Sequence, residues 1–173
     1  GTKEQIDICV NKDKFKATCR RYGVPVASEY ALEHDDVQLI DSESLKHVVY
    51  PVIVKPVDNS GSRGVYVCYN ENELRENFAK ALSFSKSKHV LTEQYLTGQH
   101  VNMYYTLSAG NIYLSAMADR YVDYLDHSSA PLPVCLVHPS RYLDKYMEET
   151  DQKVRTMFRE LGMRDGVAFV QGF

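Results

Sequence analysis

A lysine followed by a glycine-rich loop is the stretch of this sequence best suited to chemistry. It runs from Lys55 to Val65 and reads KPVDNSGSRGV. Glycine and small polar residues let backbone N–H groups approach an anion closely, and Lys55 adds positive charge beside them. The loop lacks the Gly-Lys-Ser/Thr of a Walker A motif and leads into a strand, which also excludes the dinucleotide fingerprint. Spacing alone leaves two interpretations open, a phosphate-binding loop or an ordinary polar hairpin loop.

Two strands must hold this loop. Residues 50–56 form a β-branched run bounded by prolines, which predicts a short buried strand, and residues 65–69 predict the strand after the loop. Apolar residues at helical spacing predict an amphipathic helix over 72–86. Residues 89–96 then read as a strand that runs into a connector.

An earlier helix begins after Asn11, a good N-cap, and ends at Gly23, with Pro25 just beyond it. A short helical turn over 42–47, capped by Ser42, is also predicted.

The second half of the chain predicts a hairpin of residues 101–107 and 112–120, joined by a turn at 108–111. A short strand at 134–137 and a final strand from 166 to 173 are also predicted. A long helix between them starts at Ser140 and ends at Gly162, and its inward positions are Leu143, Met147, Val154, Met157, Phe158 and Leu161. The order of elements indicates an α+β protein, in which a strand–loop–strand–helix lobe is followed by a second lobe.

Composition excludes several classes of protein. The 173 residues carry a net charge of −3 and 44% apolar residues, so neither nucleic acid nor a membrane is an expected partner. Four cysteines, Cys9, Cys19, Cys68 and Cys135, are scattered without a Cys-x-x-Cys motif. This pattern favours free thiols in a reducing cytoplasm over disulfides or a zinc site.

Five segments, in order, carry a resemblance to the ATP-grasp superfamily. Residues 11–15 with 23–26 resemble its "DK … GVP" opening, and residues 50–56 resemble its "P-hydrophobic-K-P" strand. Residues 61–65 are similar to its glycine-rich loop, and residues 92–98 to its "E-x-aromatic-hydrophobic-x-G" hinge. Residues 166–171 resemble the strand that bears the first metal ligand.

The resemblance implies roles for single residues. Lys14 and Lys55 would contact the ATP phosphates, and Gly61, Ser62 and Gly64 would form a lid that excludes water. The hinge would hold adenine through main-chain groups of Gln94 and Leu96, the carboxylate of Glu93 and the ring of Tyr95. From the residues alone, Lys14 and Glu93 would instead be a solvated helix residue and an exposed strand-end acid.

Two positions depart from the family pattern. His100 stands where an acid usually bonds the ribose, and a histidine can still bond a hydroxyl. Gln171 stands where many members have a magnesium-binding glutamate, and its neutral carbonyl is a weaker ligand for a hard cation. The carbamoyl-phosphate-synthetase branch tolerates glutamine there, so Gln171 favours that branch or a related amino-acid ligase.

The resemblance implies two α+β lobes with the nucleotide between them, residues 1–96 with the lid and 97–173 as an incomplete C-terminal lobe. The family's "E-x-N-x-R" strand, with the main metal ligands, would follow residue 173. Arg120 is a candidate catalytic residue that could hold a phosphate or carboxylate. An ion pair with Asp119, Asp123 or Asp126 is the alternative for Arg120.

The implied function is that of the ATP-binding portion of a ligase that uses ATP and Mg²⁺. The parent enzyme would activate a small carboxylate as an acyl phosphate for attack by an amine or ammonia. Flanking domains would supply most substrate residues, and this piece alone would be inactive. The alternatives are a regulatory nucleotide-binding module with a degenerate metal site and an interaction domain without ligand.

Overall fold

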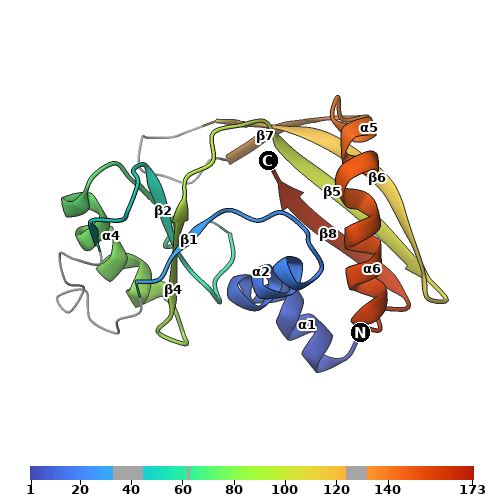
Figure 1. Ribbon diagram of the computed structural model, residues 1–173, viewed down its shortest axis with the longest axis horizontal. Helices are drawn as coiled ribbons and strands as arrows, with labels where there is room; N and C mark the ends of the chain where they lie inside the picture. Colours follow the sequence, from blue (N-terminus) through green and yellow to red (C-terminus); the bar gives the residue numbers. More distant parts are fainter. Residues whose placement is uncertain (33–44, 62, 124–131) are drawn as a thin grey trace. The chain divides into compact units, whose positions relative to one another are not determined.

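A computed structural model describes residues 1–32, 45–61, 63–123 and 132–173 of the chain (Figure 1). The chain divides into two units. Unit 1 comprises Gly1–Val26, Thr97–Asp123 and Leu132–Phe173, and the described part of unit 2 lies within Ala27–Leu96. Each unit has its own four-stranded sheet and its own apolar core.

The sheet of unit 2 has the strand order β1-β4-β2-β3. Its strands are β1 (Glu29–Tyr30), β2 (Val52–Pro56), β3 (Tyr66–Cys68) and β4 (Val90–Gln94). All three pairings are antiparallel, and β2 lies between β3 and β4. The predicted loop between two neighbouring strands is therefore confirmed.

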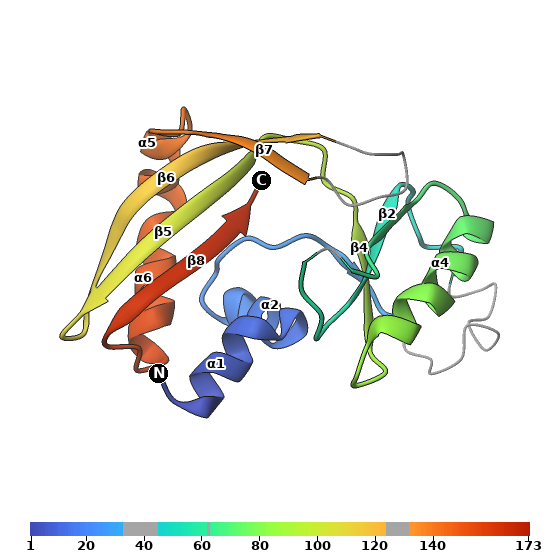
Figure 2. The ribbon, with the colours of Figure 1, turned by 180° about the vertical axis from the view of Figure 1, so that it is seen from behind.

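Helix α4 (Glu71–Phe84) of unit 2 covers one face of this sheet (Figure 2). Asn70 caps the helix by accepting a hydrogen bond from the Glu73 N–H at 3.0 Å. Strand β2 alternates buried and half-buried residues, and its buried positions Val52 and Val54 share a core with Leu74 and Phe78 of α4. The half-buried positions Ile53 and Lys55 consequently occupy the opposite face of the sheet.

The sheet of unit 1 has the strand order β7-β6-β5-β8. Strands β5 (His100–Ser108) and β6 (Asn111–Asp123) form a hairpin whose turn residues Ala109 and Gly110 both have positive φ, 50° and 83°. That is the geometry a two-residue hairpin turn prefers. Strand β7 (Leu132–Val137) pairs with β6, and β8 (Gly166–Gly172) pairs with β5. These four predicted strands are confirmed.

Helices α6 (Gln152–Glu160) and α2 (Lys12–Arg21) contribute to the apolar core on one face of this sheet. The core joins Val101, Met103 and Tyr105 of β5 with Met157 and Phe158 of α6. Helix α2 adds Cys19 to this core, and its predicted caps at Asn11 and Gly23 are confirmed. Helix α1 (Lys3–Val10) was not predicted, although Thr2 and Gln5 form a capping box at its start.

The predicted long helix is divided into three pieces. A helix α5 (Leu143–Tyr146) continues through a π-helical turn, η2 (Met147–Asp151), into α6. The π turn accompanies a buried network in which Asp151 accepts from the Tyr105 hydroxyl at 2.9 Å and from Arg155 Nε at 2.6 Å. Met147 is 44% exposed, so its predicted inward position was wrong. An extra residue in the π turn shifts the helical phase there.

The boundary between the units differs in one respect from the predicted lobes, 1–96 and 97–173. The break after Leu96 recurs, but residues 1–26 belong with unit 1. Phe15, Tyr22 and Val26 pack against the core of β5 and α6, which explains this grouping. Ser42, the predicted cap of a short helical turn, lies outside the described residues.

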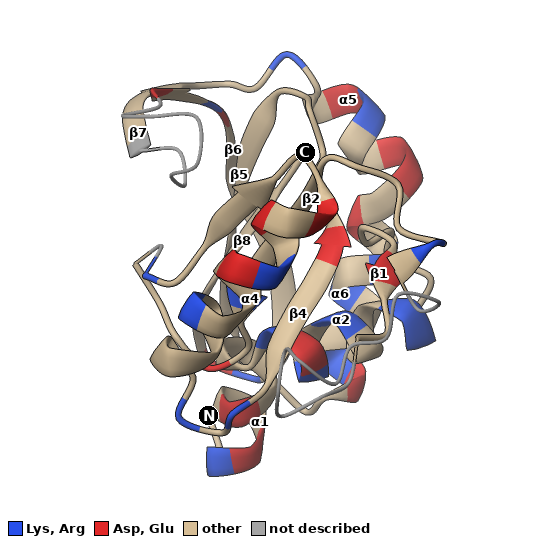
Figure 3. Cartoon of the chain, turned by 90° about the vertical axis from the view of Figure 1, so that its left-hand side faces the viewer, with Lys and Arg blue, Asp and Glu red and all other residues tan. Residues whose placement is uncertain are grey.

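Charges of both signs are spread over the helices (Figure 3). On α4 they form ion pairs one turn apart, Arg75 with Glu71 and Lys80 with Glu76. No described helix is both long and apolar enough to cross a membrane.

Candidate functional site

Lys55 and Glu93 form an ion pair on the face of the unit 2 sheet that α4 leaves uncovered. Lys55 of β2 lies opposite Leu91 of β4, and Glu93 lies opposite Ile53, so the two side chains are diagonal neighbours on one face. The Glu93 side chain is only 5% exposed and that of Lys55 21%. A buried carboxylate needs a cation or several donors, and Lys55 supplies that charge. Glu93 is thus not the exposed acid that the residue pattern alone favoured.

The loop after Lys55 contains two glycines with left-handed backbone, Gly61 at φ +67° and Gly64 at φ +75°. They differ in their surroundings. A Cβ at Gly64 would lie 2.8 Å from the Phe84 Cβ, whereas a Cβ at Gly61 would meet nothing within 4 Å. Gly64 therefore allows the loop to approach the end of α4, and Gly61 lies in the exposed part of the loop. Ser62 lies outside the described residues.

The loop is held by its own side chains. Asn59 donates to the carbonyl of Phe84 at 3.4 Å, and Arg63 Nε donates to the carbonyl of Ser60 at 3.3 Å. Asp58 accepts hydrogen bonds from Ser85 and from the Ser87 N–H at 2.7 Å. Burial raises the pKa of the Asp58 carboxyl, but these hydrogen bonds outweigh it and leave that pKa below its ordinary value. The base of the loop is therefore fixed to the chain that follows α4.

The hinge segment has part of its backbone already engaged. The Gln94 N–H donates to the Ser28 carbonyl at 2.9 Å, and the Tyr95 N–H donates to the Pro51 carbonyl at 3.2 Å. Among the described residues, no backbone carbonyl outside regular strand pairing accepts from the Leu96 N–H.

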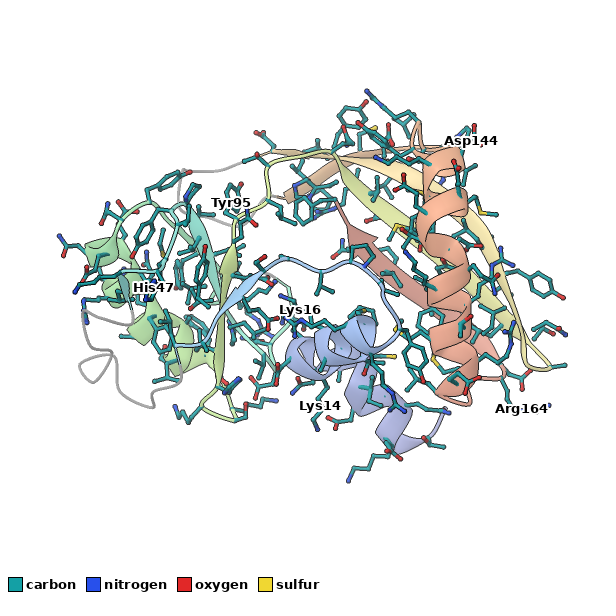
Figure 4. All side chains as sticks on the ribbon, viewed as in Figure 1. Lys14, Lys16, His47, Tyr95, Asp144 and Arg164 are labelled. Carbon is teal, nitrogen blue, oxygen red and sulfur yellow. The ribbon has the colours of Figure 1, made fainter. Side chains whose placement is uncertain are left out.

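Lys14 and Lys16 point to different sides of α2 (Figure 4). Two residues along a helix correspond to about 200° of rotation. Lys14 pairs with Asp7 of α1, and both side chains are about half exposed, 52% and 50%. Lys16 is 8% exposed and lies one turn from the core residue Cys19. Lys16 was not among the residues expected at the site, although its position among the apolar residues of α2 indicated burial.

Arg120, His100 and Gln171 lie on the face of the unit 1 sheet opposite α6. His100 and Arg120 are direct partners across β5 and β6, and Asn102 and Gln171 are direct partners across β5 and β8. Arg120 Nη1 lies 3.0 Å from His100 Nδ1, and Gln171 Nε2 donates to Asn102 Oδ1 at 3.4 Å. Asn102, which the sequence analysis did not select, is only 4% exposed. Two residues separate the rows along β5, so all four side chains share one face.

The alternative of an ion pair for Arg120 is wrong for Asp119. The Asp119 carboxylate accepts from Ser140 Oγ and from Arg141 Nε, both at 2.6 Å, on the other face of the sheet. Among the described residues no carboxylate pairs with Arg120, and Asp126 lies outside them. Arg120 is instead coupled to His100.

A metal centre built only from His, Cys, Asp and Glu is absent from the described residues, which contain no group of three such side chains suited to a metal ion. The side-chain oxygens of Gln171 and of its neighbour Asn102 are neutral amide oxygens. Such atoms can join the coordination of a hard cation whose other ligands carry charge.

The fold matches solved structures over nearly the whole chain. A biotin carboxylase from Campylobacter jejuni, solved as a β-γ-ATP complex, has a TM-score of 0.77 and 20% identity, with 96% of this chain and 37% of that chain covered. The chain thus has the ATP-grasp fold, as the resemblance implied. At 20% identity, the similarity to this biotin carboxylase concerns the fold alone.

Sequence comparison identifies the family. Residues 11–157 match the family described as the carbamoyl-phosphate synthase L chain, ATP binding domain, and the chain belongs to this family. The carbamoyl phosphate synthase large chain of Clostridium acetobutylicum is 23% identical over 156 residues, 89% of this chain and 14% of that protein. That of Sulfurisphaera tokodaii is 34% identical over 93 residues, 54% of this chain and 9% of that protein. The chain thus spans a small part of the length of these relatives.

Proposed function

We propose that this chain holds ATP for a larger ligase of the carbamoyl-phosphate-synthetase type or a related amino-acid ligase. The observation that carries the proposal is the Lys55–Glu93 pair in a domain of an ATP-binding family. A lysine kept in place by a buried carboxylate is a preorganised point charge for a phosphate oxygen. The adjoining loop, anchored at Asp58 and Gly64 and exposed at Gly61, would close over the phosphates.

The hinge would read the base. The N–H groups of Gln94 and Tyr95 already donate to backbone carbonyls. The Gln94 carbonyl would therefore accept from the purine amino group, and the Leu96 N–H would donate to a ring nitrogen. The Tyr95 ring, half-buried beside these groups, would contribute apolar contact to the base.

In unit 1, Lys14 and Lys16 are both candidates for the phosphate contact, and the burial of Lys16, against the half-exposed side chain of Lys14, favours Lys16. His100 would bond the nucleotide sugar. Mg²⁺ would be held chiefly by the phosphate oxygens of ATP, with the carbonyl oxygen of Gln171 as one protein ligand.

The parent enzyme would transfer the γ-phosphoryl group of ATP to a carboxylate oxygen, which releases ADP. An amine or ammonia would then attack the acyl carbon and displace phosphate. The carboxylate, the nitrogen donor and the flanking domains belong to the parent protein. Its expected location is the cytoplasm, a proposal that the four free thiols support.

Calorimetric titration of the full chain with magnesium and a non-hydrolysable ATP analogue tests the proposal. The Lys55→Met variant would leave Glu93 buried without this cation, so the informative variant is Lys55→Met with Glu93→Gln, which removes both charges together. We expect it to weaken binding by about tenfold or more, since a charge-assisted hydrogen bond to phosphate is lost.

The matched control is Lys80→Met with Glu76→Gln, which removes an exposed lysine–glutamate pair from the same unit. This control should bind the analogue as the unaltered chain does. Absence of binding to the unaltered chain, or equal affinity in the two double variants, would contradict the proposal.

A further inference from the structure

Arg120 and His100 form a side-chain pair between neighbouring strands. The two residues are direct partners in the antiparallel β5–β6 ladder, and Arg120 Nη1 lies 3.0 Å from His100 Nδ1. The side chain of Gln99 fastens the same position, because its Nε2 donates to the Arg120 carbonyl at 3.0 Å and to the His100 carbonyl at 3.1 Å. The ring of Phe173 lies against the imidazole, with centroids 4.4 Å apart. Both members of the pair are thus held in place.

The donor capacity of the two groups decides the state of the imidazole. A guanidinium has only N–H donors, so the ring nitrogen that faces it must accept and cannot carry a proton. A neutral imidazole with Nδ1 as acceptor carries its proton on Nε2. A doubly protonated ring would instead direct an N–H, and a positive charge, at Arg120.

The surroundings of the ring favour the same state. Burial lowers the pKa of His100 and the positive charge of Arg120 lowers it further, so the neutral form persists at neutral pH. Gln171 of β8 and Phe173, which follows this strand, have uncharged side chains.

We propose that Arg120 fixes His100 as the neutral Nε2–H tautomer and that the pair is an anion-binding element for the oxygens of a phosphate or carboxylate group. Arg120 offers the guanidinium N–H groups not used on His100, and His100 offers Nε2–H. In this state the two side chains can only donate hydrogen bonds to a ligand, because His100 Nδ1, their one acceptor, already accepts from Arg120. Such a pair suits an acceptor-rich oxyanion, whose oxygens can accept from both side chains.

Small residues occupy the neighbouring positions of β6 on this face. Ala118 is the partner of Asn102 in the next row of the ladder, and Ala116 is the partner of Tyr104 in the row after it. Both alanines lie on the same face as Arg120, so β6 presents short side chains beside the pair. The inference deepens the proposed function, since His100 belongs to both, but its first test requires no nucleotide.

Nitrogen-15 NMR of the full chain measures the tautomer directly, with the His100 signals assigned from a His100→Gln variant. We expect the neutral Nε2–H form in the unaltered chain. In Arg120→Met, which keeps an unbranched side chain but has no donor, the tautomers should mix and the pKa of His100 should rise. A purely structural role for Arg120 would leave the tautomer unchanged. An Nδ1–H ring in the unaltered chain would overturn the inference.

Titration of the same signals with inorganic phosphate and with acetate, against sodium chloride at equal ionic strength, tests the ligand class. A saturable shift with phosphate alone assigns the pair to a phosphoryl group, and one with acetate as well assigns it to a carboxylate. The Arg120→Met variant should weaken the binding by about tenfold or more. The Arg164→Met variant, which alters an exposed arginine elsewhere in unit 1, should not change it. Saturation by neither anion, or equal binding by Arg120→Met, would overturn the assignment.

If nucleotide binding to the chain fails while the tautomer and anion results hold, the proposed function fails and this inference stands. The reverse pattern would leave ATP binding intact and remove the anion-binding role of the pair.

Discussion

Gly64 carries two constraints at the scale of a single residue. Its φ of +75° is unfavourable for any residue with a Cβ, and that Cβ would lie 2.8 Å from the Phe84 Cβ. Gly61 shares the first constraint, at φ +67°, and has no neighbour within 4 Å. The loop therefore contains a natural comparison of backbone strain with and without a steric clash.

We expect Gly61→Ala to lower the free energy of unfolding by about 1 kcal/mol, from the left-handed backbone alone. Gly64→Ala should lower it by about 2–4 kcal/mol, because overpacking against Phe84 is added. Urea denaturation followed by circular dichroism measures both. Equal losses would show that the end of α4 yields to the added methyl group.

The lysines of α2 give a second comparison of single residues. Lys14→Ala should change the free energy of unfolding by less than about 0.5 kcal/mol, because exposed ion pairs contribute little. We also expect it to leave the affinity for the ATP analogue unchanged, whereas Lys16→Met should weaken that affinity. Calorimetric titration of both variants decides between the lysines. A loss with Lys14→Ala alone would restore the assignment implied by the resemblance.

At the scale of elements, Asp119 links β6 to the start of α5. Ser140 Oγ donates to Asp119 and also accepts from the Tyr142 N–H at 3.1 Å, so one hydroxyl serves both the strand and the helix start. Burial raises the pKa of the Asp119 carboxyl, but the hydrogen bonds from Ser140 and Arg141 outweigh it and leave that pKa lowered. The carboxylate form is the one that the folded chain prefers.

A carboxyl whose pKa is lowered on folding contributes stability above its unfolded pKa, about 3.9, and this contribution is lost as the pH falls through the folded value. We therefore expect Asp119→Asn to lower the free energy of unfolding at pH 7. Below about pH 4, the free energy of unfolding should decrease less steeply with falling pH in this variant than in the unaltered chain. Urea denaturation at a series of pH values measures both slopes. Parallel curves for the variant and the unaltered chain would contradict this coupling.

Ser140→Ala isolates the hydroxyl from the charge. It should lower the free energy of unfolding by about 1 kcal/mol, the usual net value of a hydrogen bond. A loss independent of pH between 5 and 8 is expected, since the serine does not titrate.

At the scale of the whole molecule, the two cores have no member in common among the residues that the structure describes. Val54 belongs to the core of unit 2 and Val154 to that of unit 1, and both side chains are almost fully buried. Truncation of either should cost about 2 kcal/mol, from lost transfer free energy and a small cavity.

Hydrogen exchange locates these losses. Val54→Ala should speed exchange of the amides in β2 and β4, and Val154→Ala that of the amides in β5 and β6. If either variant speeds exchange equally in both sheets, the units unfold as one cooperative body.

Most helices and strands could be predicted from the sequence by itself, because their signals are local. Asn11 and Gly23 set the ends of α2, turn residues set the β5–β6 hairpin, and a β-branched run between prolines set β2, because each signal acts within a few residues. The ordered motifs also determined the family, which the match over residues 11–157 confirms.

Only the tertiary structure decided which polar groups meet. Burial of Glu93 against Lys55, the commitment of Lys14 to Asp7, and the coupling of Arg120 to His100 depend on strand register and helix phase. Those properties bring together residues of different helices and strands, and a π turn such as η2 shifts the phase without a clear mark in composition. The sequence thus named the parts of a nucleotide-binding domain, while long-range packing determined which charges face one another.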